Sequence, residues 1–337
     1  MPPKSKKTIL VTGGAGYIGS HTVRMMAEQG YPLVVLDNLV YGHEKAIVND
    51  SVQLIKGGIE DKALVESIFE EYHIEAVIHF AAYAFVGESV EDPTKYYRNN
   101  TAVPIVMLDA MQRHGCDKFI FSSTCATYGD PHYVPIDEKH QQMPINPYGK
   151  SKLMLEQILQ DCDHAHGIRS ARLRYFNAAG ASLDGRIGED HVPETHLIPR
   201  ALMSLTSELD KITIFGADYE TPDGTCIRDY IHVLDLARAH ILALERLQQN
   251  HPSFSCNLGT GHGVSVKEIV DAIEKITSKK VPLAYGPRRK GDPPQLVADP
   301  RLAKEILGWE PEYKDVTKAI ETAWIWIRQP HSGRYER

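Results

Sequence analysis

A tyrosine and a lysine stand four residues apart in the stretch NPYGKSKLMLEQ, which has the periodicity of a helix. Residues at this spacing project from the same face of a helix, so Tyr148 and Lys152 are predicted to lie side by side. A phenol beside an ammonium group can carry a proton to or from a substrate hydroxyl. Because a free phenol has a pKa near ~10, positive charge must stabilise the phenolate before it acts as a base near neutral pH.

A second set of reactive groups stands at the end of the apolar run KFIFSS. Ser122, Ser123 and Thr124 fall at the carboxyl end of a predicted strand, where hydroxyl groups can bridge a sugar oxygen to the tyrosine. Small hydroxyl residues also cap strands without any catalytic role. The combination with Tyr148 is what indicates a site.

Three glycines at regular spacing separate the apolar run TILVTG from a helix pattern. In a strand, turn and helix unit, Gly13, Gly16 and Gly19 let the backbone approach a pyrophosphate, which the amides at the helix N-terminus hold. The next predicted strand, YPLVVLDN, ends at Asp37, 18 residues after Gly19. A carboxylate there can accept both ribose hydroxyls of the adenosine half and would repel a 2′-phosphate, so we expect NAD rather than NADP.

The elements that must position these groups alternate between strand and helix patterns over the first 180 residues. This alternation predicts an α/β fold, a doubly wound parallel sheet of the Rossmann type with helices on both faces. We expect an NAD-binding domain over residues 1–180. A smaller mixed lobe over residues 181–337 is expected to bind mainly substrate, with some of its elements returning to the first domain.

Two stretches of the chain are expected to depart from this alternation. The helix predicted from Pro93 to His114 contains Pro104, which should bend or break it. Beyond Asn177 comes ASLDGRIGEDHVPETHLIP, a polar stretch rich in Gly, Asp and Pro. We interpret it as a long loop, and loops of this length are often functional.

The composition excludes several classes of protein. With 42% hydrophobic and 24% charged residues and a net charge of −7, the chain has the composition of a soluble globular protein without a nucleic-acid partner. Its five cysteines are scattered and its sixteen histidines form neither HExxH nor HxH with a nearby acid, so no disulfide framework and no metal site are expected. No segment has the length of a membrane span or of a signal sequence, and a cytoplasmic protein is expected.

Longer motifs resemble the extended short-chain dehydrogenase/reductase superfamily and, within it, the UDP-glucose (UDP-galactose) 4-epimerases. The resemblance extends from residue 8 to about residue 299, and DGTCIRDYIHV and RYFN are its most specific parts. The matching stretches are VTGGAGYIGSH, LDNL, VIHFAA, VGESV, YYRNN, FIFSSTCATYGD, PYGKSKLMLEQIL, RYFNAAGA, DGTCIRDYIHVLDLA, NLGTG and RRKGD.

The resemblance implies an isomerase that uses NAD to epimerise UDP-hexoses at C4. Tyr148 would remove the proton from O4 while C4 gives hydride to NAD, and the resulting 4-keto sugar would take hydride back on its other face. Thr124 occupies the place of the hydroxyl that relays this proton. Lys152 would bond the nicotinamide ribose and lower the pKa of Tyr148.

The expected contact residues form two sets. The NAD set is Gly13, Gly16, Tyr17, Ile18, Gly19, Asp37, Asn38, Ile59, Phe80, Ala81, Ala82, Asn99, Ser122, Tyr148, Lys152 and Tyr175. The UDP-sugar set is Thr124, Asn177, His196, Leu197, Phe215, Arg228, Tyr230, Arg289, Asp292 and Leu296. Two arginines suit a pyrophosphate because the guanidinium group makes forked, charge-assisted hydrogen bonds. The alternative for Arg228 is an ordinary ion pair with Asp229.

The sequence departs from the family pattern at three positions. Gly58 replaces an aspartate that contacts the adenine amino group in many members. Ala84 stands where some members have a lysine near the cofactor, and His196 stands where many have asparagine at the substrate. The first two bear on cofactor affinity and the third on the sugar-nucleotide site.

Leu296 bears on the choice of substrate. In the family, a tyrosine at this position tends to confine members to UDP-glucose and UDP-galactose, whereas smaller side chains also admit N-acetylhexosamines. Leucine therefore predicts that both classes are accepted. The alternative is that Leu296 packs within the lobe and another group closes the pocket.

Other functions and the assembly state follow from the same motifs. A 4,6-dehydratase needs an acid pair after the hydroxyl, where this chain has Cys125 and Ala126; a decarboxylase is disfavoured by the same missing acid. An inactive NAD-binding sensor would not need Tyr148 and Lys152.

The resemblance implies a homodimer, and AVPIVMLDAM and LMLEQIL offer apolar stripes for it, unless both stripes are simply core.

Overall fold

The computed structural model describes residues 7–206, 208–289, 292–329 and 333–335. The chain forms two compact units and passes between them several times. Unit 1 comprises Met1–Thr127, Gln142–Arg174 and Ala237–Cys256, and unit 2 comprises Tyr128–Gln141, Tyr175–Leu236 and Asn257–Arg337. The assignment of cofactor binding to residues 1–180 and of substrate binding to residues 181–337 stays a prediction.

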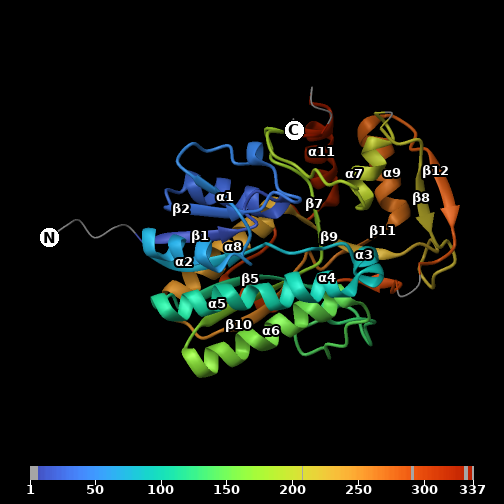
Figure 1. The fold of residues 1–337 in the computed structure, drawn as a ribbon. Coiled ribbons are helices and arrows are strands. Elements are labelled where there is room, and N and C mark those ends of the chain that lie inside the picture. The colour runs from blue at the N-terminus through green and yellow to red at the C-terminus, as the bar shows by residue number, and fades with distance from the viewer. Residues whose placement is uncertain (1–6, 207, 290–291, 330–332, 336–337) are drawn as a thin grey trace. The chain divides into compact units, whose positions relative to one another are not determined.

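Seven strands form one large sheet in the order β3, β2, β1, β4, β5, β6 and β10 (Figure 1). Their bounds are β1 (Thr8–Thr12), β2 (Leu33–Asp37), β3 (Gln53–Lys56), β4 (Ile74–His79), β5 (Lys118–Thr124), β6 (Arg169–Tyr175) and β10 (Phe254–Leu258). The pairings from β3 to β5 are parallel. The order reverses between β1 and β4, and the carboxyl ends of strands at such a switch point are where doubly wound sheets bind ligands. The predicted fold class is confirmed.

Helices cover both faces of this sheet. They are α1 (Tyr17–Glu28), α2 (Lys62–Glu71), α5 (Val103–His114), α6 (Pro147–His166) and α8 (Val233–Gln248). The shorter helices α3 (Val86–Glu91) and α4 (Pro93–Tyr97) pack against α6, and two 3-10 turns are η1 (Glu44–Ala46) and η3 (Cys125–Thr127). Figure 1 shows α5 and α6 running side by side, and both pack with α2 over one apolar cluster that contains Leu10 and Phe119. Because side chains alternate along a strand, Val11 and Val35 point to the other face, where they lie beside Gly14.

The helix predicted from Pro93 to His114 is interrupted, as expected from Pro104. Helix α4 ends at Tyr97, a π-helical turn η2 (Arg98–Ala102) follows, and α5 begins with Pro104 in its first turn. Proline is tolerated there because the first amides of a helix have no intrahelical partner. Such π-turns are frequent at functional sites, and this one contains Asn99.

The strands of unit 2 that are not in the large sheet form two further groups. Strand β9 (Ile227–His232) pairs antiparallel with β11 (Gly263–Ser265) and parallel with β13 (Gln295–Leu296) and β7 (Asn177–Ala179). A separate parallel pair consists of β8 (Ile212–Phe215) and β12 (Leu283–Gly286). The helices here are α7 (Leu197–Met203), α9 (Val266–Thr277), α10 (Arg301–Leu307) and α11 (Val316–Ile327). The expected mixed lobe is confirmed, although β7, β9, β11 and β13 were not predicted.

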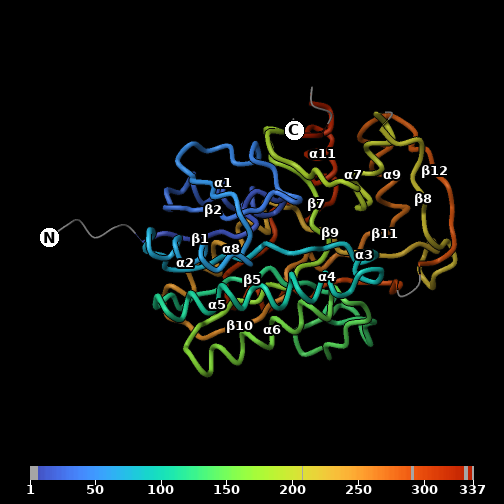
Figure 2. Tube along the Cα trace, in the orientation of Figure 1, coloured from blue at the N-terminus to red at the C-terminus, as the bar shows by residue number. Residues whose placement is uncertain are grey.

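Residues 180–196, between β7 and α7, contain no helix or strand. Figure 2 shows this yellow-green segment beside the red helix α11, and the indole Nε1 of Trp326 donates to the carbonyl oxygen of Glu189 over 3.0 Å. The prediction of a loop over 181–199 was wrong only at its end, where α7 begins at Leu197. No helix among the described residues has both the length and the apolar character needed to cross a bilayer.

Candidate active site

The glycine turn between β1 and α1 requires glycine for steric reasons. Gly13 has a φ of 71°, and a Cβ atom there would lie 2.5 Å from the backbone nitrogen of Ala81. A Cβ atom at Gly19 would lie 2.3 Å from the carbonyl oxygen of Gly13. Gly16 is the N-cap of α1, so the first amides of that helix face the turn. A compact turn lined by helix amides fits a pyrophosphate.

Asp37 ends the neighbouring strand β2 with a buried carboxylate. Its oxygen atoms accept hydrogen bonds from the backbone nitrogens of Ala15, at 2.9 Å, and Leu39, at 2.8 Å. Burial raises the pKa of Asp37, and these two amides act in the opposite direction. Each carboxylate oxygen keeps a second lone pair that can accept a ribose hydroxyl. The turn and Asp37 together fit a dinucleotide.

The space beside Gly58 is filled by the side chain of Glu60. A Cβ atom at Gly58 would lie 2.2 Å from both carboxylate oxygens of Glu60. A carboxylate therefore stands where the family aspartate is missing, although a different residue supplies it. Ala84, the second departure, is exposed.

Tyr148 lies in the first turn of α6, close to the end of β5. The side chain of Asn146 caps the helix by accepting from the nitrogen of Gly149 over 2.8 Å. A Cβ atom at Gly149 would lie 2.4 Å from the carbonyl oxygen of Ala126, so the glycine allows the helix to approach the strand end closely. This approach brings Tyr148 near Thr124, whose hydroxyl acts to lower the pKa of the phenol.

Lys152 lies one turn further along α6 and is buried. Its Nζ atom donates to the carbonyl oxygen of Ser122 over 2.8 Å and lies 5.0 Å from the centroid of the Phe121 ring. The structure thus brings together Tyr148, Lys152, Ser122 and Thr124, four residues that the sequence assigned to the site.

Burial dominates the electrostatics of this group. It raises the pKa of Tyr148 to about 12, against the influence of the Thr124 hydroxyl, which lowers it. Burial also lowers the pKa of Lys152 to about 7, while the charge of Glu156 raises it. The expectation that Lys152 lowers the pKa of Tyr148 concerns the site with NAD bound, and it stays a prediction.

A buried ion pair beneath the site was missed in the sequence. Glu156 stands four residues after Lys152, and its Oε2 atom lies 2.6 Å from Nη2 of Arg174; both side chains are almost completely buried. The hydroxyl of Ser123 donates to the other oxygen of Glu156 over 2.5 Å. The pair joins α6, β5 and β6. A carboxylate on the same helix face as Lys152 was the signal that could have revealed it.

The remaining NAD residues of unit 1 lie close to these groups. The nitrogen of Ala81 donates to the carbonyl oxygen of Thr12 over 3.1 Å, which places the residues after β4 beside the glycine turn. Asn99 donates to Asn100 over 2.9 Å, and Asn100 donates to Ser151 on α6 over 3.2 Å. The others occur on the same elements: Tyr17 and Ile18 in α1, Asn38 after β2, Ile59 before α2, and Phe80 and Ala82 after β4. Tyr175, which ends β6, is assigned to unit 2.

Strand β9 organises most of the expected UDP-sugar residues in unit 2. Arg228 and Tyr230 stand two apart and therefore point to the same face of the strand. Asn177 is the register partner of Tyr230, and Leu296 is the register partner of Arg228. Residues far apart in the sequence are thus adjacent here.

Arg228 is buried and forms an ion pair with Asp292. It does not pair with Asp229, so the alternative interpretation was wrong. The carboxylate of Asp229 instead accepts from the backbone nitrogens of Thr260, at 2.8 Å, and Ala298, at 3.1 Å. The carboxylate of Asp229 is thus hydrogen-bonded inside the fold, and the ligand-binding role of Arg228 and Asp292 stays a prediction.

Phe215 and Arg289 form a second group in unit 2. The guanidinium carbon of Arg289 lies 4.2 Å from the centroid of the Phe215 ring, and both side chains are exposed. An aromatic face with an adjacent positive charge suits a nucleotide.

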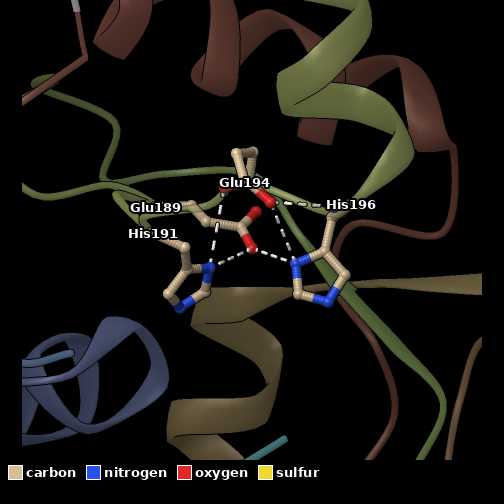
Figure 3. Close-up of side chains that lie close together, drawn as sticks. All are labelled: Glu189, His191, Glu194 and His196. Atoms are coloured by element: carbon tan, nitrogen blue, oxygen red, sulfur yellow. Dashed lines mark hydrogen bonds and ion pairs between the residues drawn. The ribbon is translucent and has the colours of Figure 1, made fainter. Parts of the chain in front are cut away.

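His196 and Leu197 stand elsewhere in unit 2, at the start of α7. His196 belongs to a cluster with Glu189, His191 and Glu194, shown in Figure 3, which the sequence analysis missed. These carboxylates raise the pKa of His191 to about 9, although burial acts in the opposite direction.

Comparison with known proteins places the chain among enzymes of one kind. The sequence profile of the NAD dependent epimerase/dehydratase family matches residues 9–259. The UDP-glucose 4-epimerase of Lacticaseibacillus casei is 50% identical over 330 residues, which cover 98% of this chain and 99% of that protein. A crystal structure of UDP-glucose 4-epimerase from Brucella ovis in complex with NAD is 52% identical, with a TM-score of 0.92 and coverage of 97% and 98%. The UDP-Glc/GlcNAc 4-epimerase from Campylobacter jejuni is 41% identical, with a TM-score of 0.83 and coverage of 95% and 98%.

Proposed function

Because the chain belongs to the NAD dependent epimerase/dehydratase family, we propose that it interconverts UDP-glucose and UDP-galactose by inverting C4 of the hexose. The observation that carries this proposal is the hydrogen bond from Lys152, one turn after Tyr148 on α6, to the carbonyl oxygen of Ser122 in β5, the strand that ends at Thr124. These are the groups needed to move a proton at a sugar hydroxyl. The glycine turn and Asp37 supply a matching dinucleotide site.

The reaction begins when the phenolic oxygen of Tyr148 accepts the proton of O4, directly or through the hydroxyl of Thr124. The C4–H bond breaks as hydride leaves, and a ketone forms at C4. When bound, NAD supplies the hydride acceptor, the later hydride donor and a positive charge that favours the phenolate. Hydride then returns to the opposite face of C4 and Tyr148 returns the proton to O4, so no net oxidation occurs.

The residues after Thr124 favour epimerisation over elimination of water. A dehydratase needs an acid beside this hydroxyl, whereas here the next two residues are Cys125 and Ala126 in the turn η3. Neither can donate a proton as a carboxylic acid does. The ketone therefore has no acid partner here for loss of the C6 hydroxyl.

Leu296 supports a broader substrate range. It is only partly buried and is the register partner of Arg228, a proposed nucleotide ligand. A leucine leaves more room than a tyrosine for the acetamido group of an N-acetylhexosamine. The Campylobacter jejuni relative acts on both UDP-glucose and UDP-N-acetylglucosamine by its name. UDP-N-acetylhexosamines are accordingly proposed as further substrates.

The proposed assembly is a homodimer that uses the exposed apolar side chains of α3, α5 and α6. Val90 is 63% exposed, Ile105 41% and Met154 42%. Helix α6 contacts both α3 and α5, so these side chains belong to neighbouring helices. Light scattering at micromolar concentration should give the mass of two chains, and the mass of one chain would contradict the dimer. None of the five cysteines, all of which the structure describes, forms a disulfide bond, which suits the reducing conditions of the proposed cytoplasmic location.

The proposed reaction is tested by incubating the purified protein with UDP-galactose and identifying the product. UDP-glucose is the expected product. A 4-keto-6-deoxy sugar nucleotide would indicate a dehydratase instead, and the absence of any product would indicate an inactive NAD-binding protein.

A further inference from the structure

Four side chains of the loop before α7 converge on one small space (Figure 3). Nδ1 of His196 lies 2.5 Å from Oε1 of Glu189, and Nδ1 of His191 lies 3.2 Å from the same oxygen. Oε2 of Glu194 lies 3.6 Å from Nδ1 of His191, and Oε1 of Glu194 lies 3.5 Å from Nδ1 of His196. Two imidazole nitrogens and two carboxylates thus face one another.

We propose that Glu189, His191, Glu194 and His196 bind a divalent transition-metal ion, with Zn²⁺ as the best match. Imidazole and carboxylate groups are both zinc ligands, whereas Mg²⁺ and Ca²⁺ take oxygen ligands. With ligand bonds of about 2.0–2.2 Å, the donor atoms of a tetrahedral zinc site lie roughly 3.3–3.6 Å apart. Nδ1 of His191 lies 3.2 Å from Oε1 of Glu189 and 3.6 Å from Oε2 of Glu194, both close to this spacing. One ligand atom from each of the four residues lies within 4.8 Å of the other three.

The contact between His196 and Glu189 must open to admit the ion. At 2.5 Å it is a hydrogen bond, which metal ligation would replace. The side chain of His196 is 44% exposed, while those of Glu189 and Glu194 are 6% and 4% exposed. The half-exposed imidazole therefore provides an entry path to two buried carboxylates.

The positions of the carboxylates are fixed by their surroundings. One oxygen of Glu194 accepts from the backbone nitrogens of Thr195, at 2.6 Å, and His196, at 2.8 Å. The backbone of Glu189 is held by the indole of Trp326, and the next residue, Asp190, accepts from the nitrogen of Tyr335 over 3.0 Å. Such supporting hydrogen bonds orient the ligands of a metal site.

The sequence expectation of no metal site rested on the motifs HExxH and HxH. The four residues here follow the pattern E-x-H-x-x-E-x-H, in which the histidines are five apart. This spacing suits a loop rather than one face of a helix, so a search for helical motifs does not find it.

The test uses the full-length protein with its bound nucleotide, treated with EDTA, dialysed and titrated with Co²⁺, followed by competition with Zn²⁺. We expect one equivalent of Co²⁺ to give the intense visible absorption of tetrahedral coordination and Zn²⁺ to remove it. His191→Ala and Glu194→Gln should each weaken binding at least roughly tenfold. His164→Ala, which removes an exposed histidine of α6, is the matched control and should bind as the parent does.

Circular dichroism of each variant checks that it is folded. Binding of equal strength in the parent and in folded His191→Ala and Glu194→Gln would overturn the proposal, because the ion would then sit elsewhere. A parent protein without the tetrahedral Co²⁺ spectrum would also overturn it, and the cluster would be an ion-pair cluster that holds the loop. Metal binding is measured apart from epimerase activity, so either result leaves the proposed function independently testable.

Discussion

Nζ of Lys152 donates a hydrogen bond to the carbonyl oxygen of Ser122 over 2.8 Å, from a position that is 3% exposed. The bond joins the helix α6, which carries Tyr148, to the strand β5, which carries Thr124. Holding an amine in this buried place lowers its pKa to about 7. Burial of Lys152 in this position therefore destabilises the folded protein while the amine is charged.

The first prediction concerns the pH dependence of stability. Since the pKa of Lys152 is about 7 in the folded chain and 10.5 as its ordinary value, the unfolded chain binds more protons between these values. Stability should therefore rise with pH above about 7, by up to roughly 1.4 kcal/mol per pH unit from this residue. Urea unfolding of the parent and of Lys152→Met at several pH values measures the difference. Parallel curves for the two proteins would show that the pKa is not lowered.

The second prediction concerns the buried pair of Glu156 and Arg174. Glu156→Gln leaves the guanidinium group buried without its counter-charge, and the free energy of unfolding should fall by about 3–5 kcal/mol. Glu28→Gln is the matched control, because Glu28 forms an exposed pair with Arg24 and should cost less than about 0.5 kcal/mol. Equal, small losses in both variants would show that the buried pair does not stabilise the fold.

The third prediction concerns the choice of cofactor. Asp37 is expected to accept the ribose hydroxyls and to repel a 2′-phosphate, so the parent should bind NAD at least roughly tenfold more tightly than NADP. Asp37→Ser combined with Asn38→Arg removes the negative charge and adds a positive one, and should narrow this ratio. Calorimetry with both nucleotides gives the affinities. Equal affinities in the parent would refute the role of Asp37.

The fourth prediction concerns substrate breadth. Leu296→Tyr should lower kcat/KM for UDP-N-acetylglucosamine by roughly ten- to a hundredfold while sparing UDP-glucose, because steric exclusion in a packed site costs about 1–3 kcal/mol. Leu183→Tyr, at a side chain that is 51% exposed, is the control and should change neither substrate. A parent that turns over UDP-glucose but not UDP-N-acetylglucosamine would show that Leu296 does not set the size of the pocket.

The large sheet was predictable because its strands are continuous apolar runs. Strands β1 and β2, with the sequences TILVT and LVVLD, are buried along their whole length. The motifs around Gly13 and Asp37 lie at the carboxyl ends of these strands, so the sheet fixes their positions. The helix pairing of Tyr148 with Lys152 follows from the helical period alone.

Strand β9 and the loop before α7 were not predictable in the same way. The sequence IRDYIH of β9 is rich in charge, and its burial depends on partners far along the chain, such as Asp292 for Arg228 and Ala298 for Asp229. The loop is held by Trp326, which lies 137 residues after Glu189. The local sequence pattern contains no information on such contacts, so neither the sheet around β9 nor the cluster that contains Glu189 was predicted.

The central claim is that Tyr148 is the acid and base of 4-epimerisation, and one substitution tests it directly. Tyr148→Phe removes only the hydroxyl, and Tyr133→Phe removes an exposed one that bonds Asp137, as a control. With circular dichroism and NAD content unchanged, the rate of UDP-galactose conversion to UDP-glucose should fall at least ~10²-fold in Tyr148→Phe and stay at the parent level in Tyr133→Phe. A rate in Tyr148→Phe within about threefold of the parent would contradict the account, because loss of the general acid and base should lower the rate by at least ~10²-fold.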